Sequence, residues 1–208
     1  MAKLYFTYSA MNAGKSAILL QAAHNYHERG MAVMLWTSHH HGSGPHANQG
    51  KIESRIGLDA PARLYRPGQD LFAAIMSEID GGELHAVMLD EAQFLTRAQV
   101  RQLARVCDDL EIPVLCYGLR TDFKGELFEG SGELLALADD LREVRTLCHC
   151  GRKATMNLRQ TSTGEAVTGG DQVAVEKDVY VSLCRRHWRE AMADDTPDFL
   201  DPAGSDAG

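Results

Sequence analysis

A Gly-Lys-Ser triplet at residues 14–16 has the side-chain types that bind phosphate. It follows an apolar, strand-like run over 4–8 and precedes an apolar stretch over 17–23 that is typical of a helix. In a strand–loop–helix unit of this kind, the loop amides and the helix N-terminus attract phosphate oxygens. The lysine would reach the terminal phosphates and the serine hydroxyl would hold Mg²⁺. The motif is incomplete, because Ser9 stands where the general pattern has its first glycine.

Two acids, Asp90 and Glu91, follow a second apolar run over 84–89. In proteins with a phosphate loop, an acid at this point holds Mg²⁺ through water or activates the nucleophile. Side chains alternate along an extended chain, so the two carboxylates are predicted to point to opposite sides, one serving the metal and one the acceptor. A pair of solvated acids is the alternative, and a phosphate loop on the same predicted sheet edge favours the functional interpretation.

Three cysteines and a histidine form two close pairs late in the chain, Cys148 with Cys150 and Cys184 with His187. These side chains are a suitable tetrahedral set for Zn²⁺, although the C-x-C spacing is shorter than the common C-x₂-C. The alternatives are three free cysteines, or a site in which His149 or His187 takes no part. Four protein ligands leave no coordination position open, so the predicted role is structural, in a segment that has little core of its own.

Composition narrows the classes of protein that the chain could be. Its 44% apolar and 24% charged residues are typical of a globular protein, and the net charge of −8 argues against a nucleic-acid polymer as partner. No apolar run approaches the roughly 20 residues of a membrane span, and the N-terminus lacks a secretory signal pattern. The chain is therefore predicted to be cytoplasmic, with no membrane partner.

Strand-like and helix-like segments alternate through the first two thirds of the chain. This alternation predicts an α/β fold with a parallel sheet, right-handed crossovers and flanking helices. Because ligands bind at the carboxyl ends of such strands, the phosphate loop, the acid pair and Gly118-Leu119 are predicted to share one edge. The expected strands are 4–8, 32–37, 84–89 and 112–117, and the expected helices are 14–29, 71–79 and 97–110.

Composition changes after about residue 144, where short β-like pieces and glycine turns replace the alternation. We predict three parts: a nucleotide-binding domain over 1–146, a small zinc domain over 147–193 and a disordered acidic tail over 194–208. The histidine-rich stretch 38–50 is predicted to be a mobile loop, with a metal site as the alternative.

Together these motifs resemble the type II thymidine kinases, the cytosolic, zinc-containing deoxynucleoside kinases. The resemblance covers roughly residues 2–191. It implies a RecA-like phosphate-loop domain and a small zinc-binding "lasso" domain that reads the base through backbone groups. The segments that carry it, in the order of the family, are YSAMNAGKS, LDEAQF, CYGLRTDFKGELF, CHCGRKA and YVSLCRRH.

The resemblance implies transfer of the ATP γ-phosphate to the 5′-hydroxyl of thymidine, with Glu91 as general base and Cys148, Cys150, Cys184 and His187 as structural zinc ligands. It also implies a homotetramer that is inhibited by the final triphosphate product. ATP and Mg²⁺ would bind at Ser9, Ala10, Met11, Asn12, Ala13, Gly14, Lys15, Ser16, Asp90 and Gln93. Thymidine would pack among Met11, Phe94, Leu119, Phe123, Phe128 and Tyr180.

The chain departs from the family in its lasso, where 175–179 lacks the usual glycine pair before the tyrosine. This difference bears on base specificity rather than on phosphoryl transfer. An alternative function is a phosphate-loop ATPase or regulatory switch whose zinc domain binds a protein partner. The phosphate loop and the acid pair fit both functions, whereas the pocket aromatics favour the kinase. A zinc-ribbon nucleic-acid binder is disfavoured by the acidic balance.

Overall fold

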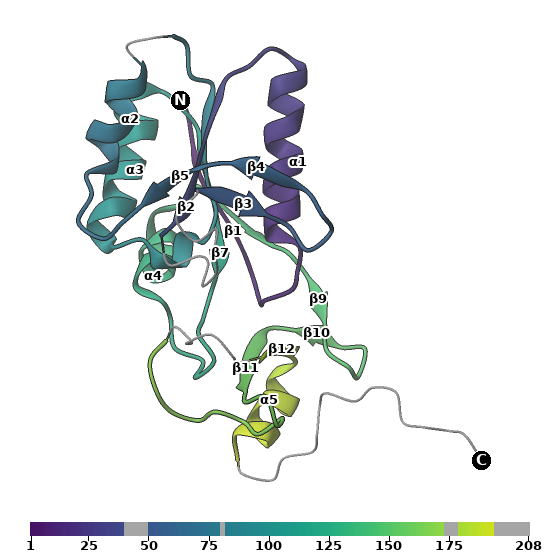
Figure 1. Ribbon diagram of the computed structural model, residues 1–208. Helices are drawn as coiled ribbons and strands as arrows, with labels where there is room; N and C mark the ends of the chain where they lie inside the picture. Colours follow the sequence, from purple (N-terminus) through teal and green to yellow (C-terminus); the bar gives the residue numbers. More distant parts are fainter. Residues whose placement is uncertain (40–49, 80–81, 173–178, 194–208) are drawn as a thin grey trace. The chain divides into compact units, whose positions relative to one another are not determined.

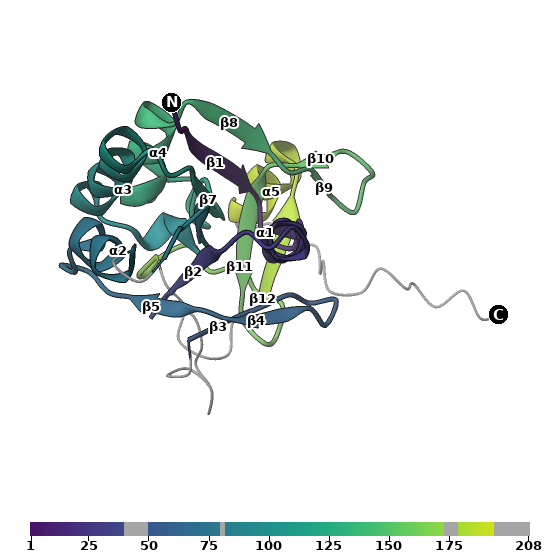
Figure 2. The same ribbon diagram turned by 90° about the horizontal axis from the view of Figure 1, so that it is seen from above.

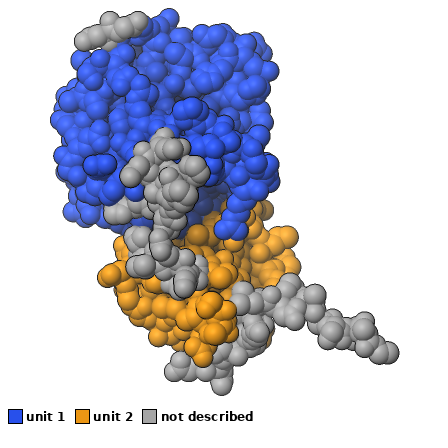
Figure 3. Space-filling view, viewed as in Figure 1, with its two compact units in different colours: residues 1–9, 14–120, 127–144 blue, residues 10–13, 121–126, 145–208 orange. Residues whose placement is uncertain are grey.

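The computed structural model describes residues 1–39, 50–79, 82–172 and 179–193 (Figure 1). The chain forms two compact units (Figure 3). Unit 1 contains the described residues of 1–9, 14–120 and 127–144, and unit 2 contains those of 10–13, 121–126 and from 145 onward. The predicted domain boundaries stay a prediction. The predicted tail, most of the predicted histidine-rich loop and most of the lasso stretch 175–179 lie outside the described residues.

A six-stranded sheet forms the centre of unit 1 (Figure 2). The strand order is β5-β2-β6-β7-β1-β8 and every neighbouring pair is parallel, which confirms the predicted fold class. The strands are β1 (Leu4–Ser9), β2 (Val33–Ser38), β5 (Arg63–Tyr65), β6 (Ala86–Leu89), β7 (Val114–Leu119) and β8 (Asp140–Glu143). The two edge strands, β5 and β8, were not predicted because they are short, and β8 is also largely exposed.

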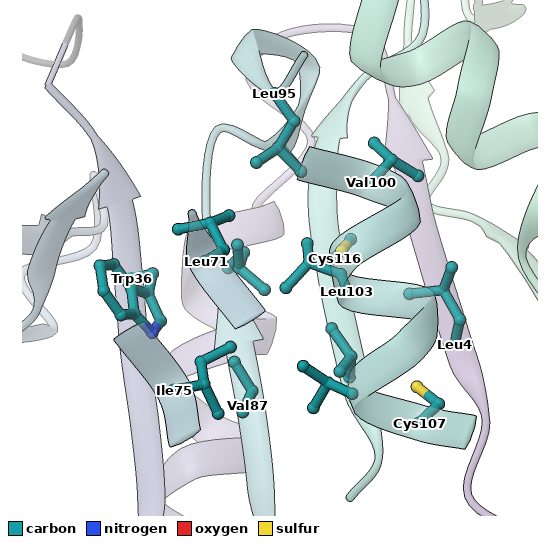
Figure 4. Close-up of a cluster of buried hydrophobic side chains, with 14 of the residues drawn as sticks. Leu4, Trp36, Leu71, Ile75, Val87, Leu95, Val100, Leu103, Cys107 and Cys116 are labelled. Atoms are coloured by element: carbon teal, nitrogen blue, oxygen red, sulfur yellow. The ribbon is translucent and has the colours of Figure 1, made fainter. Parts of the chain in front are cut away.

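Helices cover both faces of this sheet: α1 lies on one face, and α2, α3 and α4 lie on the other (Figure 2). Side chains alternate across each buried strand, so Trp36 packs in the α2–α3 core (Figure 4). Its neighbour Leu35 packs beneath α1. The helices of unit 1 are α1 (Lys15–Glu28), α2 (Leu71–Ile79), α3 (Arg97–Leu110), α4 (Glu129–Leu137) and the 3₁₀ helix η1 (Ala92–Phe94).

Local signals explain why α3 begins where the sequence predicts. The Thr96 side chain accepts a hydrogen bond from the Gln99 backbone N–H at 3.3 Å, and the Gln99 side chain accepts one from the Thr96 N–H at 3.1 Å. This capping box satisfies two amides that would otherwise lack partners at the helix start.

Helix α4 was not predicted, because two of its residues are glycines, which weaken a helical pattern. The structure gives a reason for the first of them. A Cβ at Gly130 would lie 2.6 Å from the Leu95 carbonyl oxygen and 2.7 Å from that of Ala92. The helix therefore packs against the backbone of η1 and its C-cap, and no larger side chain fits between them.

The described residues of unit 2 form small antiparallel strand pairs and a helix (Figure 1). Strands β11 and β12 pair with each other, as do β9 and β10. A small apolar cluster lies between β11, β12 and α5 and includes Leu158, Leu183 and Ala191. The elements are β9 (Thr146–Leu147), β10 (Lys153–Ala154), β11 (Met156–Gln160), β12 (Val179–Leu183) and α5 (Arg185–Met192).

The described residues have two further features. Strands β3 (Lys51–Glu53) and β4 (Asp59–Pro61) form an antiparallel hairpin that the sequence did not predict. Within the ranges that the structure covers, none of the helices combines the length and the apolar character that crossing a membrane requires.

The two glycines of α4 provide a matched test of this packing. Gly130→Ala is expected to destabilise the protein by about 2 kcal/mol, because the new methyl group overlaps backbone oxygens that cannot rotate away. Gly132→Ala in the same helix is expected to stabilise it by up to about 1 kcal/mol, since its Cβ meets nothing closer than a leucine methyl at 4.0 Å. Denaturant unfolding of both variants measures the difference, and equal shifts would contradict the close approach.

Candidate functional site

The phosphate-loop residues of unit 1 surround the start of α1. Gly14 adopts a left-handed conformation (φ 84°), which turns the chain so that the helix begins at Lys15. The Lys15 ammonium donates a hydrogen bond to the Ser9 hydroxyl at 2.9 Å. Burial lowers the pKa of Lys15, and the charges of Glu91 and Asp90 partly oppose this effect. Ser9, which departs from the general glycine, therefore serves as an acceptor for the partly buried lysine.

Ser16 and Asp90 come together at the carboxyl edge of the sheet. The Ser16 hydroxyl donates to Asp90 Oδ2 at 2.7 Å, and Asp90 is 1% exposed. The Asp90 backbone N–H donates to the Trp36 carbonyl at 2.9 Å, which extends the β6–β2 pairing by one residue. The result is a buried carboxylate and a hydroxyl held side by side at the base of the phosphate loop.

Glu91 does not continue the strand, so the predicted extended alternation of the two acids is wrong. Its backbone is left-handed (φ 56°, ψ 33°), a conformation that costs a non-glycine residue roughly 1 kcal/mol. The Tyr65 hydroxyl, fully buried, donates to the Glu91 carbonyl at 2.8 Å, and burial raises the pKa of Tyr65. The Gln93 amide donates to the Glu91 carboxylate. The carboxylate is thus oriented by a turn and not by the strand.

Gln93 links this turn to the end of β7. While its Nε2 contacts Glu91, its Oε1 accepts a hydrogen bond from the Leu119 N–H at 3.0 Å. A Cβ at Gly118 would lie 2.9 Å from both the Gln93 nitrogen and its Oε1, so glycine is required beside this side chain. No sequence pattern indicated the contribution of Tyr65, and for Gly118 the pattern indicated only a strand end.

The residues predicted to contact thymidine belong to both units. In unit 1, the rings of Phe94 and Phe128 meet edge to face with centroids 5.8 Å apart, and the Leu119 carbonyl accepts from the Ser131 hydroxyl. In unit 2, Phe123 is 1% exposed, whereas Met11 and Tyr180 are partly buried. The predicted thymidine site as a whole stays a prediction.

The apex of the phosphate loop, residues 10–13, groups with unit 2. The Met11 N–H donates to Asn157 Oδ1 at 2.7 Å, and the Met11 carbonyl accepts from the Ser182 hydroxyl at 2.6 Å. Asn12 is left-handed (φ 60°), and its side-chain amide lies 3.4 Å from the Tyr180 carbonyl. The sequence did not predict roles for Asn157 and Ser182.

The four predicted metal ligands lie together in unit 2. Their ligand atoms are all within 4.8 Å of one another. Cys150 Sγ is 4.0 Å from Cys184 Sγ, and Cys148 Sγ is 3.2 Å from His187 Nδ1. Sulfur ligands of tetrahedral zinc, each about 2.3 Å from the ion, lie about 3.8 Å apart. The cluster therefore has the composition and the dimensions of a Cys₃His zinc site.

Two local structures build this cluster. Between β9 and β10 the chain turns through Gly151 (φ 78°), and the Cys148 N–H donates to the Arg152 carbonyl at 2.8 Å. The backbone N–H of Arg152 lowers the pKa of Cys150, which favours a thiolate. Cys184 is the N-cap of α5 and His187 lies in the first turn of that helix.

His149 stays outside the ligand set. Its ring stacks on that of His187, with centroids 4.3 Å apart and an interplanar angle of 18°. The His187 Nε2 atom lies 4.0 Å from the Glu190 carboxylate, on the side of the ring away from the sulfur atoms. The closeness of Nδ1 to the Cys148 sulfur supports Nδ1 as the ligand atom.

A parallel sheet with a Gly-Lys-Ser loop after β1 and a buried acid after β6 defines a phosphate-loop nucleotide-binding protein. A family model described as thymidine kinase matches residues 2–188. The chain is 58% identical over 198 residues to a thymidine kinase of Mesorhizobium japonicum, covering 95% of this chain and 96% of that protein. It is 52% identical over 193 residues to a thymidine kinase of Yersinia pestis, covering 92% and 97%. The chain belongs to the thymidine kinase family, which confirms the predicted resemblance.

Proposed function

We propose that this protein is an ATP-dependent thymidine kinase that transfers the γ-phosphate of ATP to the 5′-hydroxyl of thymidine, giving ADP and thymidine monophosphate. The observation that carries the proposal is the junction of the phosphate loop with the acid pair: Lys15, Ser16, Asp90 and Glu91 lie at one sheet edge in a chain of this family. A cytoplasmic location, a homotetramer and inhibition by the triphosphate product stay predictions.

Glu91 acts as the general base in this reaction. Its carboxylate takes the proton of the 5′-hydroxyl while that oxygen attacks the γ-phosphorus and the bond to the β-phosphate oxygen breaks. Gln93 and Tyr65 keep the carboxylate in place, because one donates to its side chain and the other to its backbone carbonyl. Lys15 and the loop amides stabilise the negative charge on the phosphate oxygens.

Ser16 and Asp90 would hold Mg²⁺ together with the ATP phosphates. Their oxygens are 2.7 Å apart, near the roughly 2.9 Å that separates adjacent oxygen ligands in octahedral magnesium coordination. The ion would supply positive charge at the β- and γ-phosphates. Cys148, Cys150, Cys184 and His187 would hold a structural zinc ion that joins the β9–β10 turn to α5.

The first test is ADP release from Mg-ATP by the purified protein, with single nucleosides added in turn. Thymidine is expected to stimulate release, with little effect from deoxycytidine or purine nucleosides. ATP turnover that is indifferent to nucleosides would contradict the proposal and indicate a phosphate-loop switch. Stimulation by another nucleoside alone would support a nucleoside kinase but contradict thymidine as its acceptor.

Glu91→Gln is expected to lower kcat by about 10²–10⁴-fold, because the amide keeps the shape of the side chain but cannot take a proton. ATP binding, measured by calorimetry with a non-hydrolysable analogue, should change little. The matched control is Glu111→Gln, since Glu111 is also a left-handed glutamate (φ 54°) but is exposed at the end of α3. Near-normal turnover of Glu91→Gln would rule out this residue as the base.

Metal analysis is expected to find one zinc ion per chain, and Cys184→Ala should lose it. Loss of the ion should unfold unit 2 and abolish thymidine binding, because the apolar cluster of this unit is small. Cys107→Ala is the control: Cys107 lies in the unit 1 core, where burial raises the pKa of its thiol to about 11, and zinc content should not change. A zinc-free protein that still phosphorylates thymidine would refute the metal assignment.

A further inference from the structure

Asn157 uses both atoms of its side-chain amide to connect two segments that are far apart in the sequence. Its Oδ1 accepts from the Met11 N–H at 2.7 Å, at the apex of the phosphate loop. Its Nδ2 donates to the Thr121 carbonyl at 3.1 Å, at the start of the segment 121–126. The side chain comes from β11 and is 2% exposed. One buried amide therefore holds two loops in unit 2.

The chemistry of the partners fixes the orientation of this amide. A backbone N–H must face the carbonyl oxygen of the side chain, and a backbone carbonyl must face its NH₂ group. Aspartate could accept from Met11 but could not donate to Thr121, and leucine could do neither. The asparagine side chain can form both hydrogen bonds. A buried backbone group left without a hydrogen-bond partner would destabilise the fold.

A second side chain holds Met11 from the opposite strand. Asn157 on β11 and Ser182 on β12 are directly opposed in the hairpin register, and the Ser182 hydroxyl donates to the Met11 carbonyl at 2.6 Å. The two side chains thus hold the N–H and the carbonyl of one loop residue. The chain continues directly from this apex to Gly14 and Lys15, so the position of Met11 constrains the phosphate-binding backbone.

Hydrogen bonds hold the shape of the segment 121–126. The Asp122 carboxylate accepts from the backbone N–H groups of Lys124 and Glu126, each at 2.9 Å. The Trp188 indole N–H donates to the Phe123 carbonyl at 2.9 Å. Because the segment holds its own shape, the anchor at Thr121 transmits position to Phe123, a predicted thymidine contact.

We propose that Asn157 is a positioning residue that fixes the phosphate-loop apex and the segment 121–126 relative to each other, so that ATP binding and thymidine binding are coupled. The positioning half of this proposal, that Asn157 fixes the two segments relative to each other, depends only on contacts within unit 2. The coupling half rests on the proposed thymidine kinase function. A coupling of this kind requires a physical connection between the two binding segments, and the amide of Asn157 supplies one.

Hydrogen exchange of the full-length protein tests the positioning half without substrates. In Asn157→Asp, amide exchange is expected to become about tenfold faster in both 10–13 and 121–126. Ser182→Ala removes the contact to the Met11 carbonyl alone, so faster exchange is expected in 10–13 only. The proposal would be overturned if Asn157→Asp made amide exchange faster in one segment alone or in neither. It would also be overturned if Ser182→Ala made exchange equally faster in both segments. If Asn157→Asp does not fold, Asn157→Ser is measured in its place, and faster exchange in one segment alone or in neither would again overturn the proposal.

Steady-state kinetics test the coupling half. Asn157→Asp is expected to raise KM for both ATP and thymidine by about tenfold, with a smaller change in kcat. In this variant, thymidine should no longer change the affinity for a non-hydrolysable ATP analogue. Asn25→Asp, the same replacement on the exposed face of α1, should leave all constants unchanged. A rise in one KM alone would refute coupling. Absence of thymidine phosphorylation in the unmodified protein would refute the proposed function, while hydrogen exchange would still decide the role of Asn157.

Discussion

The turn out of β6 at Glu91 is the constraint on which the candidate active site depends. A strand that ended with two extended residues would send the carboxylates to opposite faces, and only one could serve the phosphate loop. The left-handed backbone at Glu91 removes this alternation while Asp90 stays bonded to Ser16. Such a conformation persists only where the surroundings hold it, and here the Tyr65 hydroxyl, the Gln93 amide and the absence of a side chain at Gly118 do so. The residues that keep the acid in place therefore come from the ends of β5 and β7 and from η1.

Unit 2 holds loops in place although it has little apolar surface to bury. Its hydrophobic cluster includes two of the four candidate zinc ligands, Cys148 and Cys184, so the metal site and the core are one structure. The β11–β12 hairpin beside this cluster holds Met11 through Asn157 and Ser182, and α5 holds Phe123 through Trp188. A small unit of this kind, with a candidate metal site in its core, can fix the positions of loops through polar contacts whose partners lie far away in the sequence.

The sequence predicted what is encoded locally and missed what distant contacts impose. Helix α3 was predicted with its observed bounds because its apolar periodicity lies within the helix and its capping residues lie in it or directly before it. The Cys₃His cluster was predicted because residue type and spacing limit the alternatives. By contrast, α4 depends on the close approach of Gly130 to the carbonyls of η1 and Leu95. The conformation of Glu91 depends on Tyr65, 26 residues earlier, and the role of Asn157 depends on Met11, 146 residues away. No local pattern carries that information.

The charges at the phosphate loop explain why one serine can stand in for the usual glycine. Lys15 is desolvated near two carboxylates, so its ammonium needs a neutral acceptor that is already in place before any phosphate arrives. The Ser9 hydroxyl is such an acceptor at 2.9 Å, and a glycine at this position would offer no side-chain oxygen.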